Sequence, residues 1–287
     1  MSPQRTDRWV RIGLHGPALV AVVVVALIAG LLVVESLGAL RAIGAGFITD
    51  RGWQPARDAA DGAFRITPMV VATLLVTAGA VLLATPLGVA SALFTRFYAP
   101  APVARAYRRL IELLAGIPGV LFGFWGMMVV VPLLATVRPP GASILAAMLV
   151  LALMILPTIA LLTDSTLRAL PRRYLDGAAA LGLSRWGTIA GVVLPAARGG
   201  IATAVILACG RAIGETLAVV MVIGNQVQFP DGLLAPARAL TGNIALEMGY
   251  ASGDHRAALF LSGLVLLLMV AVLVGLASRL GGHHGNA

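Results

Sequence analysis

Six long apolar stretches, almost free of charge, divide this chain and limit what it is able to fold into. They cover residues 16–34, 66–95, 113–137, 142–163, 199–225 and 257–278. A helix that spans a bilayer needs about 20 consecutive apolar residues, and each stretch is of that order. The composition agrees, because 59% of the 287 residues are hydrophobic and only 11% are charged, about half of what a soluble domain carries. The sequence therefore predicts an all-α, polytopic integral membrane protein with six transmembrane helices.

The positions of the arginines predict how these helices are oriented. All 21 basic residues are arginine; 13 fall on the side of the two termini, 7 fall on the opposite side, and Arg211 lies within a span. Basic loops are retained on the cytoplasmic side of a membrane, so both termini are predicted to be cytoplasmic. The net charge of +9 is thus explained by topology and does not indicate nucleic-acid binding.

The apolar stretches and the polar segments between them predict the domain organisation. The expected parts are a cytoplasmic N-terminus (1–15), a first transmembrane helix with an outer loop (16–66), a core of five transmembrane helices (67–280) and a C-terminal tail (281–287). Within the core, a basic segment at about residues 165–198 is expected to form a cytoplasmic loop. No convincing small-residue cleavage site follows the first apolar stretch, so we interpret it as a retained helix and not as a signal peptide.

The fifth apolar stretch, Gly199–Asn225, contains two charges, Arg211 and Glu215. Read as one helix, it is about 40 Å long, which places Arg211 near the middle of the bilayer. An arginine at that depth costs roughly 3 kcal/mol, so its guanidinium must face protein or water. The two residues are four apart and are therefore expected on one helix face. Two interpretations stay open: an ion pair that only neutralises itself, or a binding element for a charged substrate.

The predicted cytoplasmic loop contains the segment YLDGAAALGLSRWGTIAGVVLP, from Tyr174 to Pro195. Gly182 is expected to separate two short helices, and Ser184 to cap the second. A pair of short helices facing the cytoplasm suits the docking of a soluble partner. An amphipathic helix pair lying on the membrane surface is the alternative interpretation.

This segment resembles the coupling loop of ABC importer permeases. Their pattern is E-A-A, three residues, G, nine residues, I, one residue and L-P. The chain departs from it conservatively at Asp176 and Val192, and at Gly177 in place of the first alanine. The resemblance implies the MetI-like permease fold and an ATPase-coupling role for this loop. The coupling residues it implies are Asp176, Gly177, Ala178, Gly182, Leu194 and Pro195.

Further segments resemble the phosphate-specific, PstC-like branch of these permeases. They cover most of the chain from about Thr67 onward, and GRAIGETLAVVMVIGN is the most specific of them. The resembling segments are Glu112–Gly126, Ile155–Ala160, Gly210–Asn225 and Leu240–Gly249. By this resemblance Arg211 and Glu215 lie in the substrate path, and arginine offers the planar fork of donors that phosphate requires.

Other polar residues are weaker candidates for lining the path. They are Thr73, Thr77, Thr216 and Asn225. Such side chains often bond their own helix backbone instead, so this alternative stays open for all four.

The resemblance also implies partners. They are a PstA-like second permease, a PstB-like ATPase dimer on the cytoplasmic side and a PstS-like phosphate-binding protein on the outer side of a bacterial cytoplasmic (inner) membrane. The chain itself has no G-x-x-x-x-G-K-[ST] loop and no lysine, so it is not expected to be an enzyme. ATP would be used by the partner ATPase, and no cofactor is expected on this chain. Its histidines (His15, His255, His283 and His284) lack metal-ligand companions, so no metal site is expected.

Two other functions remain open from the sequence. One is a permease for a related oxyanion such as phosphonate, sulfate or molybdate. The other is a membrane anchor or sensor without transport, in which the charged pair is only structural.

Overall fold

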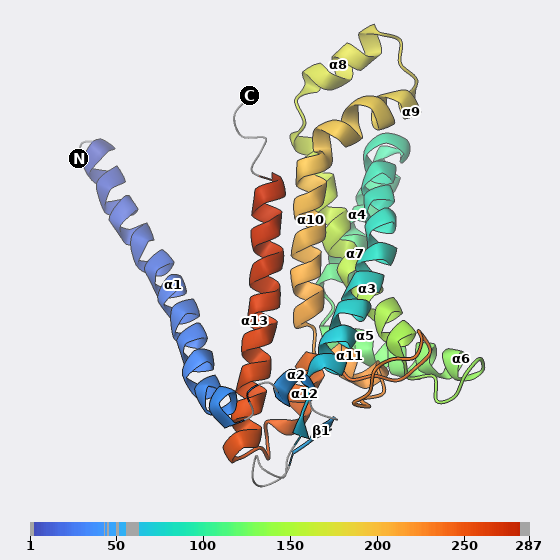
Figure 1. Ribbon diagram of the computed structural model, residues 1–287. Coiled ribbons are helices and arrows are strands. Elements are labelled where there is room, and N and C mark those ends of the chain that lie inside the picture. Colours follow the sequence, from blue (N-terminus) through green and yellow to red (C-terminus); the bar gives the residue numbers. More distant parts are fainter. Residues whose placement is uncertain (1–2, 43, 45, 50–51, 56–62, 282–287) are drawn as a thin grey trace. The chain divides into compact units, whose positions relative to one another are not determined.

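The computed structural model describes residues 3–42, 44, 46–49, 52–55 and 63–281, most of which are helical (Figure 1). Contacts divide the chain into two units. One comprises Met1–Arg65 with Glu247–Leu267, and the other Ile66–Leu246 with Leu268–Ala287.

The first unit contains the long helix α1 (Pro3–Ala42), α2 (Gly46–Thr49) and a small antiparallel sheet. The sheet pairs β1 (Trp53–Gln54) with β2 (Ala63–Phe64). The Trp53 indole donates to Glu247 Oε2 at 2.6 Å, and His255 Nε2 lies 2.8 Å from the same oxygen. Since His255 is in the first turn of α13 (Gly253–Gly281), these buried contacts hold the sheet to that helix.

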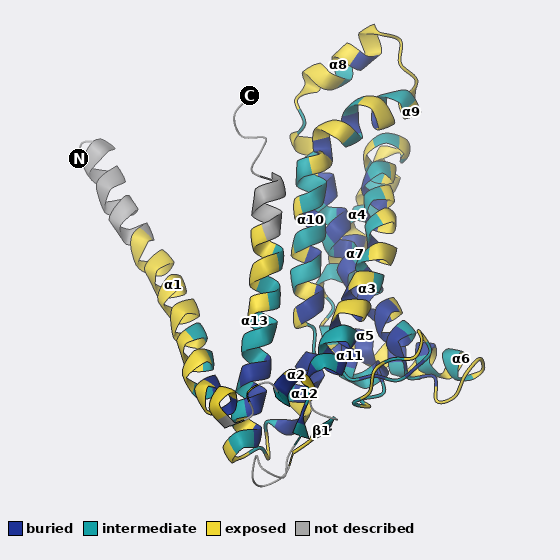
Figure 2. Ribbon diagram, in the orientation of Figure 1, coloured by how far each residue is buried: buried dark blue, intermediate teal, exposed yellow. Residues whose placement is uncertain are grey.

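The second unit is organised around α7 (Ile144–Ala169), which is buried over most of its length (Figure 2). It packs against α3 (Thr67–Leu93), which continues as the π-helical segment η1 (Phe94–Tyr98). The two helices approach closely because small residues face α7: a Cβ atom built at Gly88 would lie 2.8 Å from Ile159 Cγ2. The helix α10 (Leu194–Gly214) packs against both.

The third apolar stretch forms a bent pair of helices and not one straight helix, so the predicted count of six spans is met only if this pair is one span. The helix α4 (Ala101–Gly116) begins before this stretch and contains Arg105, Arg108 and Arg109. Its successor α5 (Gly119–Trp125) leaves at a bend of 94°. Between them Ile117 and Pro118 are extended, with ψ of 129° and 137°. A proline disfavours the helical conformation of the residue before it and has no N–H to continue the ladder. The segment then continues through η2 (Gly126–Val130) and α6 (Val131–Ala135).

The fifth stretch is also broken, and the prediction of a single helix from Gly199 to Asn225 is wrong. A continuous span covers α9 (Arg185–Thr188), η3 (Ile189–Val193) and α10, so it begins earlier than expected. It ends at Gly214, and Glu215 is extended, with ψ of 128°. A short helix, α11 (Leu217–Val222), follows the break. Glycine is a weak helix former, and the Glu215 carboxylate accepts a bond from the start of the next helix instead.

The described residues contain five helices that are long and apolar enough to cross a membrane, or six if the bent pair counts as one. They are His15–Arg41, Thr67–Tyr98, Ile144–Ala169, Arg185–Gly214 and Gly253–Gly275, with Ala101–Gly116 and Gly119–Ala135 as the bent pair. The all-α class and the polytopic architecture are therefore confirmed.

Candidate functional site

Arg211 lies in the last turn of α10, and its side chain is exposed. Its Nη1 donates to Thr158 Oγ1 on α7 at 3.3 Å, the one hydrogen bond that Arg211 makes within the described residues. A guanidinium has five N–H donors. Most of them therefore remain available to an anion that approaches this face of α10.

Glu215 does not pair with Arg211: among the described residues no ion pair joins them. Its Oε1 accepts from the Ala218 N–H at 3.2 Å. The carboxylate also lies against the start of α5, where a Cβ atom at Gly119 would be 3.1 Å from either oxygen. The expected shared helix face and the self-neutralising ion pair are both absent here, because the helix ends before Glu215.

A small pocket opens beside Glu215 between segments that are distant in the sequence. Thr73 and Thr77 of α3 line it together with Glu215 and Thr241. Thr241 Oγ1 donates to the Glu215 carbonyl at 3.0 Å, and Thr73 Oγ1 accepts from the Leu240 N–H at 2.9 Å. Two of the weaker candidates from the sequence are thus placed next to the charged centre.

Thr73, Thr216 and Asn225 bond the backbone, as the alternative interpretation expected. Thr73 Oγ1 donates to the Met69 carbonyl of its own helix at 2.8 Å. Thr216 Oγ1 donates to the Gly214 carbonyl at 3.3 Å, inside the break between α10 and α11. Asn225 has a φ of 55°, in the left-handed region, and its Nδ2 donates to the Val220 carbonyl at 2.7 Å. Its own carbonyl accepts from Arg238 Nε at 3.0 Å. Asn225 therefore fixes the end of α11, and whether Thr216 and Asn225 also line the path stays a prediction.

The coupling-loop segment forms two short helices about a glycine turn, as predicted. They are α8 (Arg172–Ala180) and α9, and Gly182 between them has a φ of 64°. Ser184 caps α9, since its Oγ accepts from the Gly187 N–H at 3.1 Å. Large apolar side chains are exposed on this loop, with Leu181 at 80% and Trp186 at 63%. Exposed apolar side chains of this kind fit a protein partner or a membrane surface, so both interpretations of the loop stay open.

The other predicted coupling residues lie on α8 and at the start of α10. Asp176 and Gly177 lie exposed on α8, whereas Ala178 is buried. The helix α10 begins with Leu194 and Pro195, and Pro195 is exposed. Proline is tolerated there because the N–H that it lacks has no partner in the first turn of a helix.

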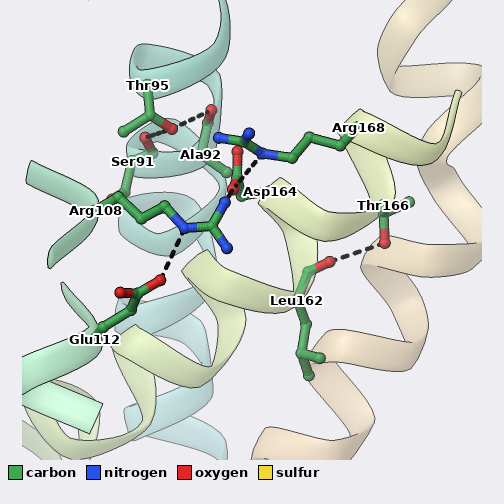
Figure 3. A network of polar contacts seen from close by, with 9 residues as sticks. All are labelled: Ser91, Ala92, Thr95, Arg108, Glu112, Leu162, Asp164, Thr166 and Arg168. Carbon is green, nitrogen blue, oxygen red and sulfur yellow. Dashed lines mark hydrogen bonds and ion pairs between the residues drawn. The ribbon is translucent and has the colours of Figure 1, made fainter. Parts of the chain in front are cut away.

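A network of four charged side chains, which the sequence analysis did not identify, joins α4 to α7 (Figure 3). Arg108 Nη1 donates to Asp164 Oδ2 at 2.8 Å, and Arg108 Nε to Glu112 Oε1 at 2.8 Å. Arg168 Nε donates to the same Asp164 oxygen at 2.9 Å. The i,i+4 spacing of the two charges within each helix could have predicted the two pairs inside the helices. No feature of the sequence predicts the bond between the two helices.

Metal binding has little support in the described residues. No group of three or more histidine, cysteine, aspartate or glutamate side chains is placed to hold an ion there. His283 and His284 lie outside the residues that the structure describes.

Comparison with known proteins identifies relatives over most of the chain. Residues 84–283 match the family described as binding-protein-dependent transport system inner membrane component. A probable ABC transporter permease protein, YqgH of Bacillus subtilis, is 40% identical over 228 residues, which are 78% of this chain and 73% of the relative. The phosphate transport system permease protein PstC of Mesorhizobium japonicum is 33% identical over 282 residues, 90% of this chain and 85% of the relative.

Solved structures share the fold at lower identity. A bacterial ABC transporter involved in the import of alginate aligns with a TM-score of 0.68 and 12% identity, covering 99% of this chain and 100% of that chain. The inward-facing MetNI methionine ABC transporter aligns with a TM-score of 0.58 and 19% identity, covering 75% of this chain and 92% of that chain. At such low identities the comparison supports the shared fold alone.

Proposed function

The chain belongs to the family of binding-protein-dependent transport system inner membrane components, and we propose that it is the permease subunit of an ABC importer for inorganic phosphate. The relatives named PstC, at 32–33% identity over most of the chain, support phosphate as the substrate. One structural observation carries the proposal furthest: Arg211 presents an exposed guanidinium, largely without protein partners in the described chain, on an apolar helix.

The chemistry of the site suits a transported anion. The fork of N–H donors on Arg211 matches two oxygens of a phosphate group. Glu215 is held by the Ala218 N–H and not by Arg211, so the arginine keeps its charge available. A transport site must bind strongly enough to admit the ion and weakly enough to release it. A nearby carboxylate that repels the anion serves that release.

The partners of the proposed importer follow from the same assignment. They are a PstA-like permease, a PstB-like ATPase dimer and a PstS-like phosphate-binding protein, the first of which would complete the path beside Arg211. In this proposal ATP is hydrolysed by the ATPase, and no catalytic or cofactor-binding role is assigned to this chain. The exposed Leu181 and Trp186 of the coupling loop support docking of the ATPase there.

The proposed location is a bacterial cytoplasmic (inner) membrane with both termini in the cytoplasm. The excess of arginines on the side of the termini supports this orientation. It places α8 and α9 in the cytoplasm, where an ATPase has access to them. Alternating access then exposes Arg211 first to the outer side and afterwards to the inner side.

Uptake of labelled phosphate and labelled sulfate by cells that lack this chain, with and without the restored gene, tests the function. We expect restoration of phosphate uptake only. Restored sulfate uptake would instead support the related-oxyanion function, and no change for either ion would support an anchor or sensor.

A further inference from the structure

The buried carboxylate of Asp164 is the centre of the charged network in Figure 3. Asp164 is 4% exposed, and its Oδ2 accepts from two arginines, one on α4 and one on its own helix α7. Two acids and two arginines make the network neutral as a whole. Removing a charge from water is costly, so a buried carboxylate of this kind is retained only with such partners.

One oxygen atom of the network lacks a hydrogen-bond partner. Asp164 Oδ1 is buried and has no hydrogen-bond partner within the described residues. A small pocket beside it is lined by Ser91, Thr95 and Tyr107. The Ser91 hydroxyl donates to the Tyr107 hydroxyl within the pocket, and Thr95 donates to the Ala92 carbonyl. Within the described residues, Asp164 therefore depends on its two arginine contacts for hydrogen bonding.

Each of the two bridged helices leads to one of the charged residues of the candidate path. On α7, Thr158 accepts the hydrogen bond from Arg211. It lies six residues before Asp164, about 9 Å along the helix axis. On the other side, α4 turns at Ile117 and Pro118 into α5, whose first residue, Gly119, contacts the Glu215 carboxylate.

The same helix α7 also leads to the coupling loop. It ends at Ala169, and only Leu170 and Pro171 separate it from α8. Both residues are extended, with ψ of 131° and 135°, so the connection is two residues long. A displacement of α8 would therefore act on the end of α7 that carries Asp164.

We propose that Arg108 and Asp164 are positioning residues that make α4 move with α7 when the coupling loop is displaced. This rests on the proposed transport function. With the bridge intact, Thr158 and Gly119 shift together, so the surroundings of Arg211 and Glu215 change in one step. Without the bridge, α7 moves alone, so the surroundings of Arg211 change while those of Glu215 stay the same. ATP is then hydrolysed without phosphate transport.

The test uses the complete importer, reconstituted in proteoliposomes with its partner permease, ATPase and binding protein. ATP hydrolysis and phosphate import are measured in the same vesicles for Arg108→Gln and Asp164→Asn. We expect the import rate to fall about tenfold or more, the factor that a loss of about 1.4 kcal/mol in the transport step produces, while hydrolysis stimulated by the loaded binding protein stays near wild type. Arg108→Lys, which keeps the charge, should recover part of the import.

Two matched controls separate the bridge from charge in general. Arg168→Gln removes the bond to the same Asp164 oxygen from within α7, without crossing to α4. Arg109→Gln removes an exposed charge beside Arg108. Both should keep the ratio of phosphate imported to ATP hydrolysed.

Three results would overturn the inference. An unchanged ratio in Arg108→Gln and Asp164→Asn would mean that the bridge transmits nothing. A proportional loss of import and hydrolysis would mean that it only holds the fold together. Absence of phosphate import by the wild-type complex would overturn the proposed function itself, and the inference with it.

Discussion

Gly119 lies directly against the carboxylate of Glu215, although the two residues come from different apolar stretches of the chain. A Cβ atom at Gly119 would sit 3.1 Å from each carboxylate oxygen. Gly119 begins the helix after the bend at Pro118, and Glu215 follows the end of α10. The charged centre is therefore built where two broken helices meet.

The contact predicts a mild but specific effect of Gly119→Ala. The added methyl group must push the carboxylate by a few tenths of an ångström, so we expect reduced phosphate uptake at normal membrane abundance. Gly116→Ala is the matched control, because a Cβ atom there meets nothing within 4 Å. Equal uptake by the two variants would show that the position of Glu215 does not matter for transport.

Gly182→Val should uncouple the ATPase through the backbone alone. A Cβ atom at Gly182 meets nothing within 4 Å, but its φ of 64° costs a branched residue about 1 kcal/mol or more. The turn between α8 and α9 then changes its path. We expect normal insertion and pairing of the permease, with loss of stimulated ATP hydrolysis.

Gly177→Ala is the control for this prediction. Gly177 lies within α8 and has open space around it, so alanine should stabilise that helix by about 0.5–1 kcal/mol and leave coupling intact. Wild-type hydrolysis and uptake in Gly182→Val would refute the role given to the turn.

Asn225 should prove to be a backbone-fixing residue, which comparison of two substitutions would reveal. Asn225→Gly keeps the left-handed conformation and loses only the bond to the Val220 carbonyl, worth about 1 kcal/mol. Asn225→Ala loses the bond and adds about 1 kcal/mol of strain. The thermal stability of the purified protein should therefore fall more for alanine than for glycine. The reverse order would contradict the geometry described for the end of α11.

Thr158→Val should weaken the hold on Arg211. The two side chains have nearly the same shape, so the main loss is the 3.3 Å bond from the guanidinium. A freer arginine should raise the phosphate concentration needed for half-maximal uptake, and Thr158→Ser should restore it. The control is Thr203→Val, since Thr203 bonds only the Gly199 carbonyl of its own helix in the described chain. A shift of equal size in the control would contradict a specific role of Thr158.

Much of this architecture could be predicted from local sequence signals. The apolar runs indicated the spans, and the Gly182 turn and the Ser184 cap were correctly predicted because each depends on a few neighbouring residues. The breaks before Gly119 and after Gly214 were missed, since hydropathy does not register a change of direction inside an apolar run. Pro118 was a visible signal, but prolines are also tolerated within membrane helices: α7 continues through Pro157.

The candidate site was only partly accessible to the same reasoning. Arg211 and Glu215 stood out because charges are rare in apolar stretches, yet their separation depends on the helix ending at Gly214. The bridge from Arg108 to Asp164 joins residues 56 positions apart in the chain. Nothing in the local pattern of either helix specifies such a long-range pairing.

Phosphate import by charge variants of Arg211, in the reconstituted importer and at equal membrane abundance, tests the central claim most directly. Arg211→Gln should abolish import, and Arg211→Lys should retain at most weak import, because the charge stays but the fork of donors is lost. The decisive form is the double variant Arg211→Gln with Glu215→Gln, which removes both charges together and leaves the site neutral. If Arg211 binds the anion, the double variant imports no phosphate. Import near the wild-type rate would contradict the account, because it would show that the two charges have only a structural role.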